Sequence, residues 1–166
     1  MKTAKNILSQ TRLNRLRAQG YTAQSDEILS DMSFGIRFAY RTCVCFILVA
    51  MATESIALFS AMLCITMFGV ILPKHPFDYV YNATLSKVLN KPKLGERSAQ
   101  LKFACTIASI WVATIVILLS IELTTAALVL AGMLAFTAFL PATIDYCIPS
   151  VIYNLIFTEK VRIINQ

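Results

Sequence analysis

Long stretches without charge alternate with short charged segments along this 166-residue chain. Residues 55–73 and 103–121 contain no Asp, Glu, Lys or Arg, and a third such run covers 123–144. Each run is close to the length of about 20 residues that a helix needs to cross a bilayer. Because backbone amides in lipid must be bonded within their own segment, we predict helical crossings at about 55–72, 103–121 and 123–144.

A fourth crossing is predicted closer to the beginning of the chain, where the charge-free run is shorter. Only residues 42–53 lack charge, so a helix of bilayer length must extend back to about residue 35 and include Arg37 and Arg41. These arginines lie four residues apart near one helix end, where long basic side chains reach the headgroups. The predicted crossing is about 35–53, followed by a tight turn at Glu54.

Composition supports the same class of protein. Apolar residues make up 57% of the chain and charged residues only 14%, against about 25% charged residues in ordinary soluble domains. We therefore predict an all-α membrane protein with three parts. Residues 1–34 form an amphipathic N-terminal segment, 35–157 a four-helix transmembrane domain, and 158–166 a tail.

Short motifs recur in the two halves of the chain. Leu-Pro closes each predicted hairpin, at residues 72–73 and 140–141, and Asp-Tyr follows at 78–79 and 145–146. Each break is followed by a proline placed to begin a helix. The pattern predicts two hairpins in parallel orientation, each followed by a short interfacial amphipathic helix.

The basic residues predict the orientation. All 15 Lys and Arg residues lie in the N-terminal segment up to Arg41, in residues 74–102 or in the tail. The two short turns carry Glu54 and Glu122 instead. Because basic loops remain in the cytoplasm, both termini and the middle loop are predicted to be cytoplasmic.

We interpret the net charge of +6 as arising from these basic cytoplasmic segments, which would face anionic lipid. No nucleic-acid partner is expected. The N-terminal helix either lies on the membrane or docks a partner. The candidate partner or lipid surface consists of Arg12, Arg15, Arg17, Arg37, Arg41, Lys87, Lys91 and Lys93.

Chemistry is predicted mainly from the cysteines. Small apolar packing is the interpretation that we favour for the cysteines. The alternative is a thiol site at Cys105 and Cys147, the candidate thiols, which fall toward the cytoplasmic ends of their predicted helices. Asp145 is a possible functional acid, because a carboxylate near the headgroups needs a partner or water. His75 is a weak candidate metal ligand, but no metal-type spacing accompanies it. No cofactor is expected.

The motifs HPFDYVYN at 75–82, KFAC at 102–105 and CIPSVIY at 147–153 resemble an uncharacterised bacterial membrane family, domain of unknown function 4395. The resemblance covers about residues 35–157. It implies a four-helix protein of the bacterial inner membrane. Some members accompany thioredoxin-like or sulfurtransferase-like proteins, which favours a thiol role for Cys105 and Cys147.

Three functions stay open. The first is an accessory or scaffold subunit that docks a protein partner, or a second copy, at the cytoplasmic face. The second is thiol or sulfur handling by cytoplasmic-face cysteines. The third is a small-solute channel or transporter, which the apolar crossings disfavour. Recognisable catalytic motifs are absent, so the enzyme question is left open with a preference for a non-enzymatic role.

Overall fold

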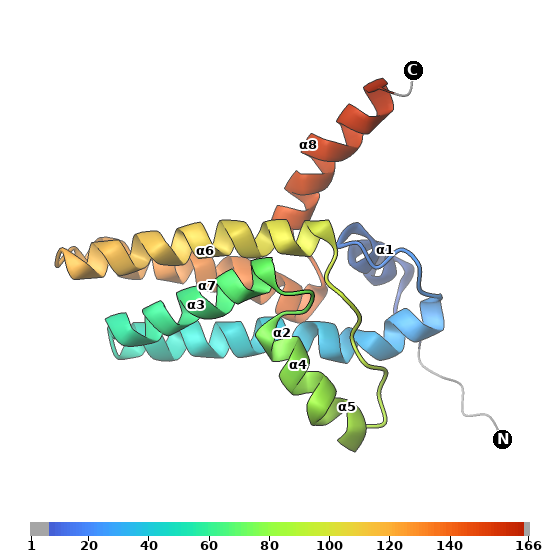
Figure 1. Ribbon diagram of the computed structural model, residues 1–166, viewed down its shortest axis with the longest axis horizontal. Coiled ribbons are helices and arrows are strands. Elements are labelled where there is room, and N and C mark those ends of the chain that lie inside the picture. Colours follow the sequence, from blue (N-terminus) through green and yellow to red (C-terminus); the bar gives the residue numbers. More distant parts are fainter. Residues whose placement is uncertain (1–6, 165–166) are drawn as a thin grey trace.

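The computed structural model describes residues 7–164, and side chains as far as residue 157. Within these residues all regular structure is helical (Figure 1). The helices are α1 (Gln10–Ala18), α2 (Asp26–Ala52), α3 (Ile56–Ile71), α4 (Pro76–Ala83), α5 (Leu85–Val88), α6 (Ala99–Ser120), α7 (Thr124–Ile144) and α8 (Ile148–Ile164).

Helices α2, α3, α6 and α7 lie lengthwise beside one another (Figure 1). The tight α2–α3 and α6–α7 connections share one end of this bundle, here named the turn end. Helix α1 covers the other end, here named the cap end, from which α4 and α8 also depart. Helix α2 packs chiefly on α7 and α3 chiefly on α6, around a core that includes Ile47, Phe59, Val112 and Ala131.

Helices α2, α6 and α7 are long and apolar enough to cross a membrane. Helix α3 has only 16 residues and qualifies as a fourth span when joined to α4 and α5, which bend away by 83°. The prediction of helices long and apolar enough to cross a membrane is thus confirmed for three segments. The fourth depends on the break that Pro73 and Pro76 introduce, because proline cannot continue a helix.

Helix α2 begins at Asp26, well before the predicted start near residue 35. Ser25 precedes Asp26 and Glu27, and acids in a first turn are favourable at the positive end of a helix. The added turns bury Leu29 and Met32 beneath α1, in a cluster that also contains Leu13 and Leu16. The N-terminal segment therefore packs on the bundle.

The sequence also predicted helices after each hairpin, and α4 and α8 occupy those positions. Helix α4 begins with a capping box in which the Asp78 carboxylate accepts the backbone N–H of His75. Pro76 supplies the first helical position, where its missing N–H costs nothing. This turn fixes His75 and Asp78 at the cap end of the bundle.

Candidate functional site

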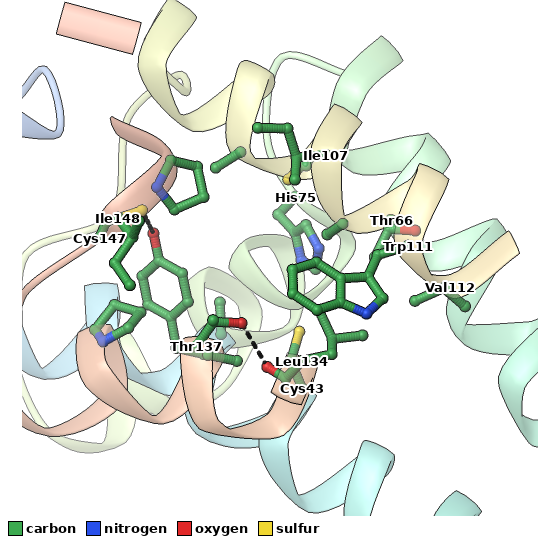
Figure 2. A pocket seen from close by; sticks show the side chains of 18 of the residues that line it. Cys43, Thr66, His75, Ile107, Trp111, Val112, Leu134, Thr137, Cys147 and Ile148 are labelled. Atoms are coloured by element: carbon green, nitrogen blue, oxygen red, sulfur yellow. Dashed lines mark hydrogen bonds between the residues drawn. The ribbon is translucent and has the colours of Figure 1, made fainter. Parts of the chain in front are cut away.

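A cavity of about 190 Å³ lies near the cap end of the bundle, here named the thiol cavity. Cys43 of α2, Cys105 of α6 and Cys147, just before α8, all line it. His75 and Arg97 line it as well, and most of the remaining wall is apolar. Figure 2 shows Cys43, His75, Trp111 and Cys147 on different sides of the same space.

Cys105 is buried and receives a hydrogen bond from Arg97, with 3.6 Å between Nη1 and Sγ. The same guanidinium forms a bidentate pair with Asp78, with its Nε 2.7 Å from Oδ2 and its Nη2 3.2 Å from Oδ1. Both side chains are buried, at 7% and 4% exposed. Burial lowers the pKa of Arg97, but the adjacent Asp78 carboxylate raises it overall, so the guanidinium stays charged.

His75 lies against both Cys105 and the backbone of α3. A Cβ built on Gly69 would lie 2.5 Å from Cδ2 of His75 and 3.0 Å from Sγ of Cys105. Only a glycine leaves room for the imidazole and the thiol to meet here.

The imidazole of His75 is neutral at physiological pH. It lies in the connection between α3 and α4, where burial, reinforced by the charge of Arg97, lowers its pKa to about 3. Its Nδ1 accepts the backbone N–H of Phe77, so the proton of the neutral ring resides on Nε2. His75 therefore presents an N–H donor beside Cys105, and the backbone bond fixes this tautomer.

A second chain of contacts joins the thiol cavity to the N-terminal segment. The hydroxyl of Tyr40 lies 3.9 Å from Sγ of Cys147 and 3.3 Å from Oε1 of Gln19. The Gln19 amide donates to the backbone carbonyl of Asp145 at 2.8 Å. Gln19, the residue after Ala18 of α1, thus contacts the cavity wall through Tyr40.

Asp145, the predicted functional acid, follows α7 in a left-handed conformation, with φ 60°. Its carboxylate binds Nε of Arg12 at 2.7 Å, and Nε and Nη2 of Arg37 at 2.6 and 2.7 Å. Burial raises the pKa of Asp145, whereas the hydrogen bond and charge of Arg12 lower it. The pKa is raised overall, and contact with two guanidinium groups offsets part of the effect of burial by favouring the ionised carboxylate.

The same arginines and their neighbours bind the last carbonyls of α7. Arg12 donates to the carbonyl of Thr143, Arg15 to that of Ile144 and Arg41 to that of Ala142. Basic side chains at a helix C-terminus satisfy free carbonyls and oppose the negative end of the dipole. Four residues of the predicted partner or lipid surface, counting Arg37, therefore hold the fold together.

The other residues of that predicted surface lie elsewhere. Arg17 pairs with Asp26, and Lys91 lies 3.4 Å from Asp31. Lys87 and Lys93 are exposed on or after α5. The structure therefore does not bring the eight basic candidates together on one face.

No group of three or more His, Cys, Asp or Glu side chains in the described part of the chain is arranged to hold a metal ion. The structure does bring the predicted residues Cys105, Cys147 and His75 to one cavity, whereas Asp145 belongs to the separate cluster with Arg12. Sequence reasoning missed Arg97, Tyr40 and Gly69. No local pattern marks these three, because their roles depend on neighbours from other helices.

The fold and the cavity define a membrane-like helical protein with a thiol-lined interior. A family model described as Domain of unknown function (DUF4395) matches residues 33–157. The chain belongs to this family, which confirms the predicted resemblance. No curated protein and no solved structure matches the chain. Helix α1 and the first turns of α2 lie outside the matched residues.

Proposed function

We propose that this protein handles thiols or sulfur in the thiol cavity, with Cys105 as the reacting residue. The observation that carries the proposal is the hydrogen bond from Arg97 to the Cys105 sulfur, and His75 lies near the same position of α3, at Gly69. A hydrogen-bond donor that faces a sulfur favours its thiolate form, which is the nucleophile in thiol chemistry, and so opposes burial, which favours the neutral thiol.

The proposed reaction is thiol–disulfide exchange. The Cys105 thiolate attacks one sulfur of a small or protein disulfide, a new S–S bond forms, and the original S–S bond breaks. The departing thiolate takes up the proton that Cys105 lost, so no further oxidant or reductant is needed. A thioredoxin-like or sulfurtransferase-like protein, expected from the family resemblance, is a candidate source of that sulfur.

We further propose that the cap end faces the cytoplasm of a bacterial inner membrane. The basic N-terminal segment and residues 74–102 meet at this end, and basic segments remain on the cytoplasmic side. Both termini are then cytoplasmic. The thiol cavity is on the side where thiols stay reduced, which suits a reactive cysteine better than a structural disulfide.

The two halves are, in this proposal, copies of one unit with the same orientation. In support, each hairpin packs on the other through equivalent helix pairs, α2 with α7 and α6 with α3. The Asn82 side chain pairs with the backbone of Leu94, and that of Asn154 donates to the carbonyl of Ala18. Both asparagines thus tie the helix after one hairpin to the segment before the other.

Docking of a partner at the cytoplasmic face, with a scaffold role, stays a prediction. Its main support was the basic surface, and Arg12, Arg15, Arg37 and Arg41 instead bind the end of α7. The channel or transporter hypothesis likewise stays a prediction.

The test uses the full chain in lipid vesicles and a small aromatic disulfide as the probe, with each cysteine followed by mass spectrometry. We expect Cys105 to form the mixed disulfide at least tenfold faster than Cys64, an exposed cysteine outside the cavity. The double variant Asp78→Asn/Arg97→Gln removes both charges together, so that neither is left buried alone.

In this double variant the Cys105 rate should fall toward that of Cys64, while the Cys64 rate stays unchanged. A Cys105 rate equal to that of Cys64 in the unmodified protein would overturn the proposal. An unchanged Cys105 rate in a folded double variant would show that Arg97 has no part in the proposed reaction.

A further inference from the structure

The thiol cavity is enclosed on one side and open on another. Its α2 and α3 wall is buried at Ile47, Met62 and Thr66. The wall formed by α6 and α7 is only half-buried at Trp111 and Ala138. The half-buried part of the wall thus includes side chains of two helices that are long and apolar enough to cross a membrane.

A shallow apolar groove continues from this opening along the outer surface of α6 and α7. Ile110, Thr114 and Leu130 line the groove, and it shares Ile107 and Trp111 with the cavity. The indole N–H of Trp111 binds the Leu130 carbonyl at 3.1 Å, which fixes the shared wall. The groove and the cavity therefore adjoin at Ile107 and Trp111, on the face that lipid would cover.

The size of the cavity limits the ligand. A dry apolar cavity of about 150 Å³ is large enough to bind benzene. The thiol cavity, at about 190 Å³, therefore has room for one substituted six-membered ring. A longer chain attached to that ring has to remain in the groove.

The polar groups of the cavity fit an uncharged ring that carries oxygen. Arg97 is balanced by Asp78, so the wall needs no ionic ligand. Arg97 and the neutral His75 supply hydrogen-bond donors, whereas the Tyr40 hydroxyl already lies 3.3 Å from Oε1 of Gln19 and 3.9 Å from Sγ of Cys147. Pro141 has no N–H for the carbonyl of Thr137, which also lines the cavity, so one backbone acceptor is available.

We propose that the thiol cavity binds the ring of a membrane-soluble quinone, whose chain leaves between α6 and α7 along the groove. The carbonyl oxygens of the ring accept from the donors of the wall. Small side chains at Ala108 and Ala138 leave the passage free. This binding goes beyond thiol exchange, because it needs no reaction at Cys105.

Trp111 is the only tryptophan and lines the cavity, so its fluorescence reports occupancy. The experiment titrates the full chain in lipid nanodiscs with a fully substituted benzoquinone that carries a decyl chain, since quinones quench indole emission. Full substitution of the ring prevents addition of thiols. We expect saturable quenching in the unmodified protein and still in Cys105→Ser, which cannot undergo the thiol reaction, so that the two proposals can fail separately.

Ala138→Phe fills the passage and should weaken quinone binding at least tenfold. Ala57→Phe makes the same change at an exposed position of α3 outside the cavity and should leave binding unchanged. If Ala138→Phe does not fold, Ala108→Phe takes its place. Quenching that never saturates, or that is equal in the blocked and control variants, would overturn the proposal. So would equal displacement of the quinone by a decyl alcohol without a ring.

Discussion

Two acids follow the two helical hairpins, and they are used differently. Asp145 lies between Arg12 and Arg37, with the C-terminal carbonyls of α7 taken up by the surrounding basic side chains. Asp78 binds a single guanidinium, that of Arg97, besides the backbone N–H of His75, and a third N–H of that guanidinium reaches Cys105 in the cavity.

The difference between the two acids separates a structural ion-pair cluster from one that also contacts a candidate reactive group. The Asp145 cluster directs its basic groups onto backbone and carboxylate, which suits a purely structural role. The Asp78–Arg97 pair directs one donor at a thiol. Breaking the first should change stability alone, whereas breaking the second should change stability and the reactivity of Cys105 together.

The largest effect is expected for Asp145→Asn. It leaves two guanidinium groups facing a neutral amide, and removal of one partner from a buried ion pair costs about 3–5 kcal/mol. Thermal unfolding in detergent measures the loss. Asp26→Asn, at an exposed pair with Arg17, is the matched control and should cost less than about 1 kcal/mol. A similar loss in both variants would contradict the structural role of Asp145.

Asp78→Asn should destabilise the protein by a comparable amount, about 3 kcal/mol, because it strands the buried Arg97. It should also alter the labelling rate of Cys105, since the freed guanidinium has the thiol as its remaining neighbour. Mass spectrometry of alkylated peptides checks this below the unfolding temperature. The same assay on Asp145→Asn should show an unchanged labelling rate of Cys105. A changed rate would contradict the proposed difference between the two acids.

Gly69→Ala tests the contact between His75 and Cys105 directly. The added methyl would lie 2.5 Å from His75 and 3.0 Å from Cys105, and overpacking of this kind costs about 1–3 kcal/mol. Cys105 labelling should change as well. Gly132→Ala is the control, because its nearest neighbour would be Met51 at 3.8 Å. It should be neutral or stabilising, and equal losses at both positions would argue against a special contact at Gly69.

The smallest effect is a dependence of stability on pH. His75 is the only histidine, and its pKa of about 3 lies below the ordinary value of 6.5. Between these values the unfolded state binds the proton and the folded state does not, so acidification favours unfolding. From pH 7 to pH 5 the protein should lose about 2 kcal/mol. His75→Asn should abolish most of this loss, and an equally steep decline in that variant would place the titration elsewhere.

Much of the architecture could be predicted from local pattern. The charge-free runs located α3, α6 and α7 to within a few residues, because lipid demands a long uninterrupted apolar helix. Pro73 and Pro76 located the break before α4, since proline cannot donate within a helix. Leu-Pro at 140–141 was wrong as the end of the second hairpin, because α7 continues through Pro141 to Ile144.

The predicted crossing at 35–53 covers only the later part of α2, which begins at Asp26. Residues 26–34 are too polar to belong to an obvious crossing, and they become helical against α1, which covers Leu29 and Met32. The predicted basic surface does not form as one face for a similar reason, because contacts between helices decide where its side chains lie. The sequence shows where the basic residues are, but it does not show that several of them bind the C-terminal end of α7.

The sequence by itself determined the class of protein, the approximate helices and the family, because these follow from residue order over about 20 positions. Only the tertiary structure decided which charges pair and which thiols meet. Arg37 and Asp145 are 108 residues apart in the chain, and Cys43, Cys105 and Cys147 come from three different segments. Such meetings depend on how helices pack, and packing is a property of the whole bundle that no local pattern contains.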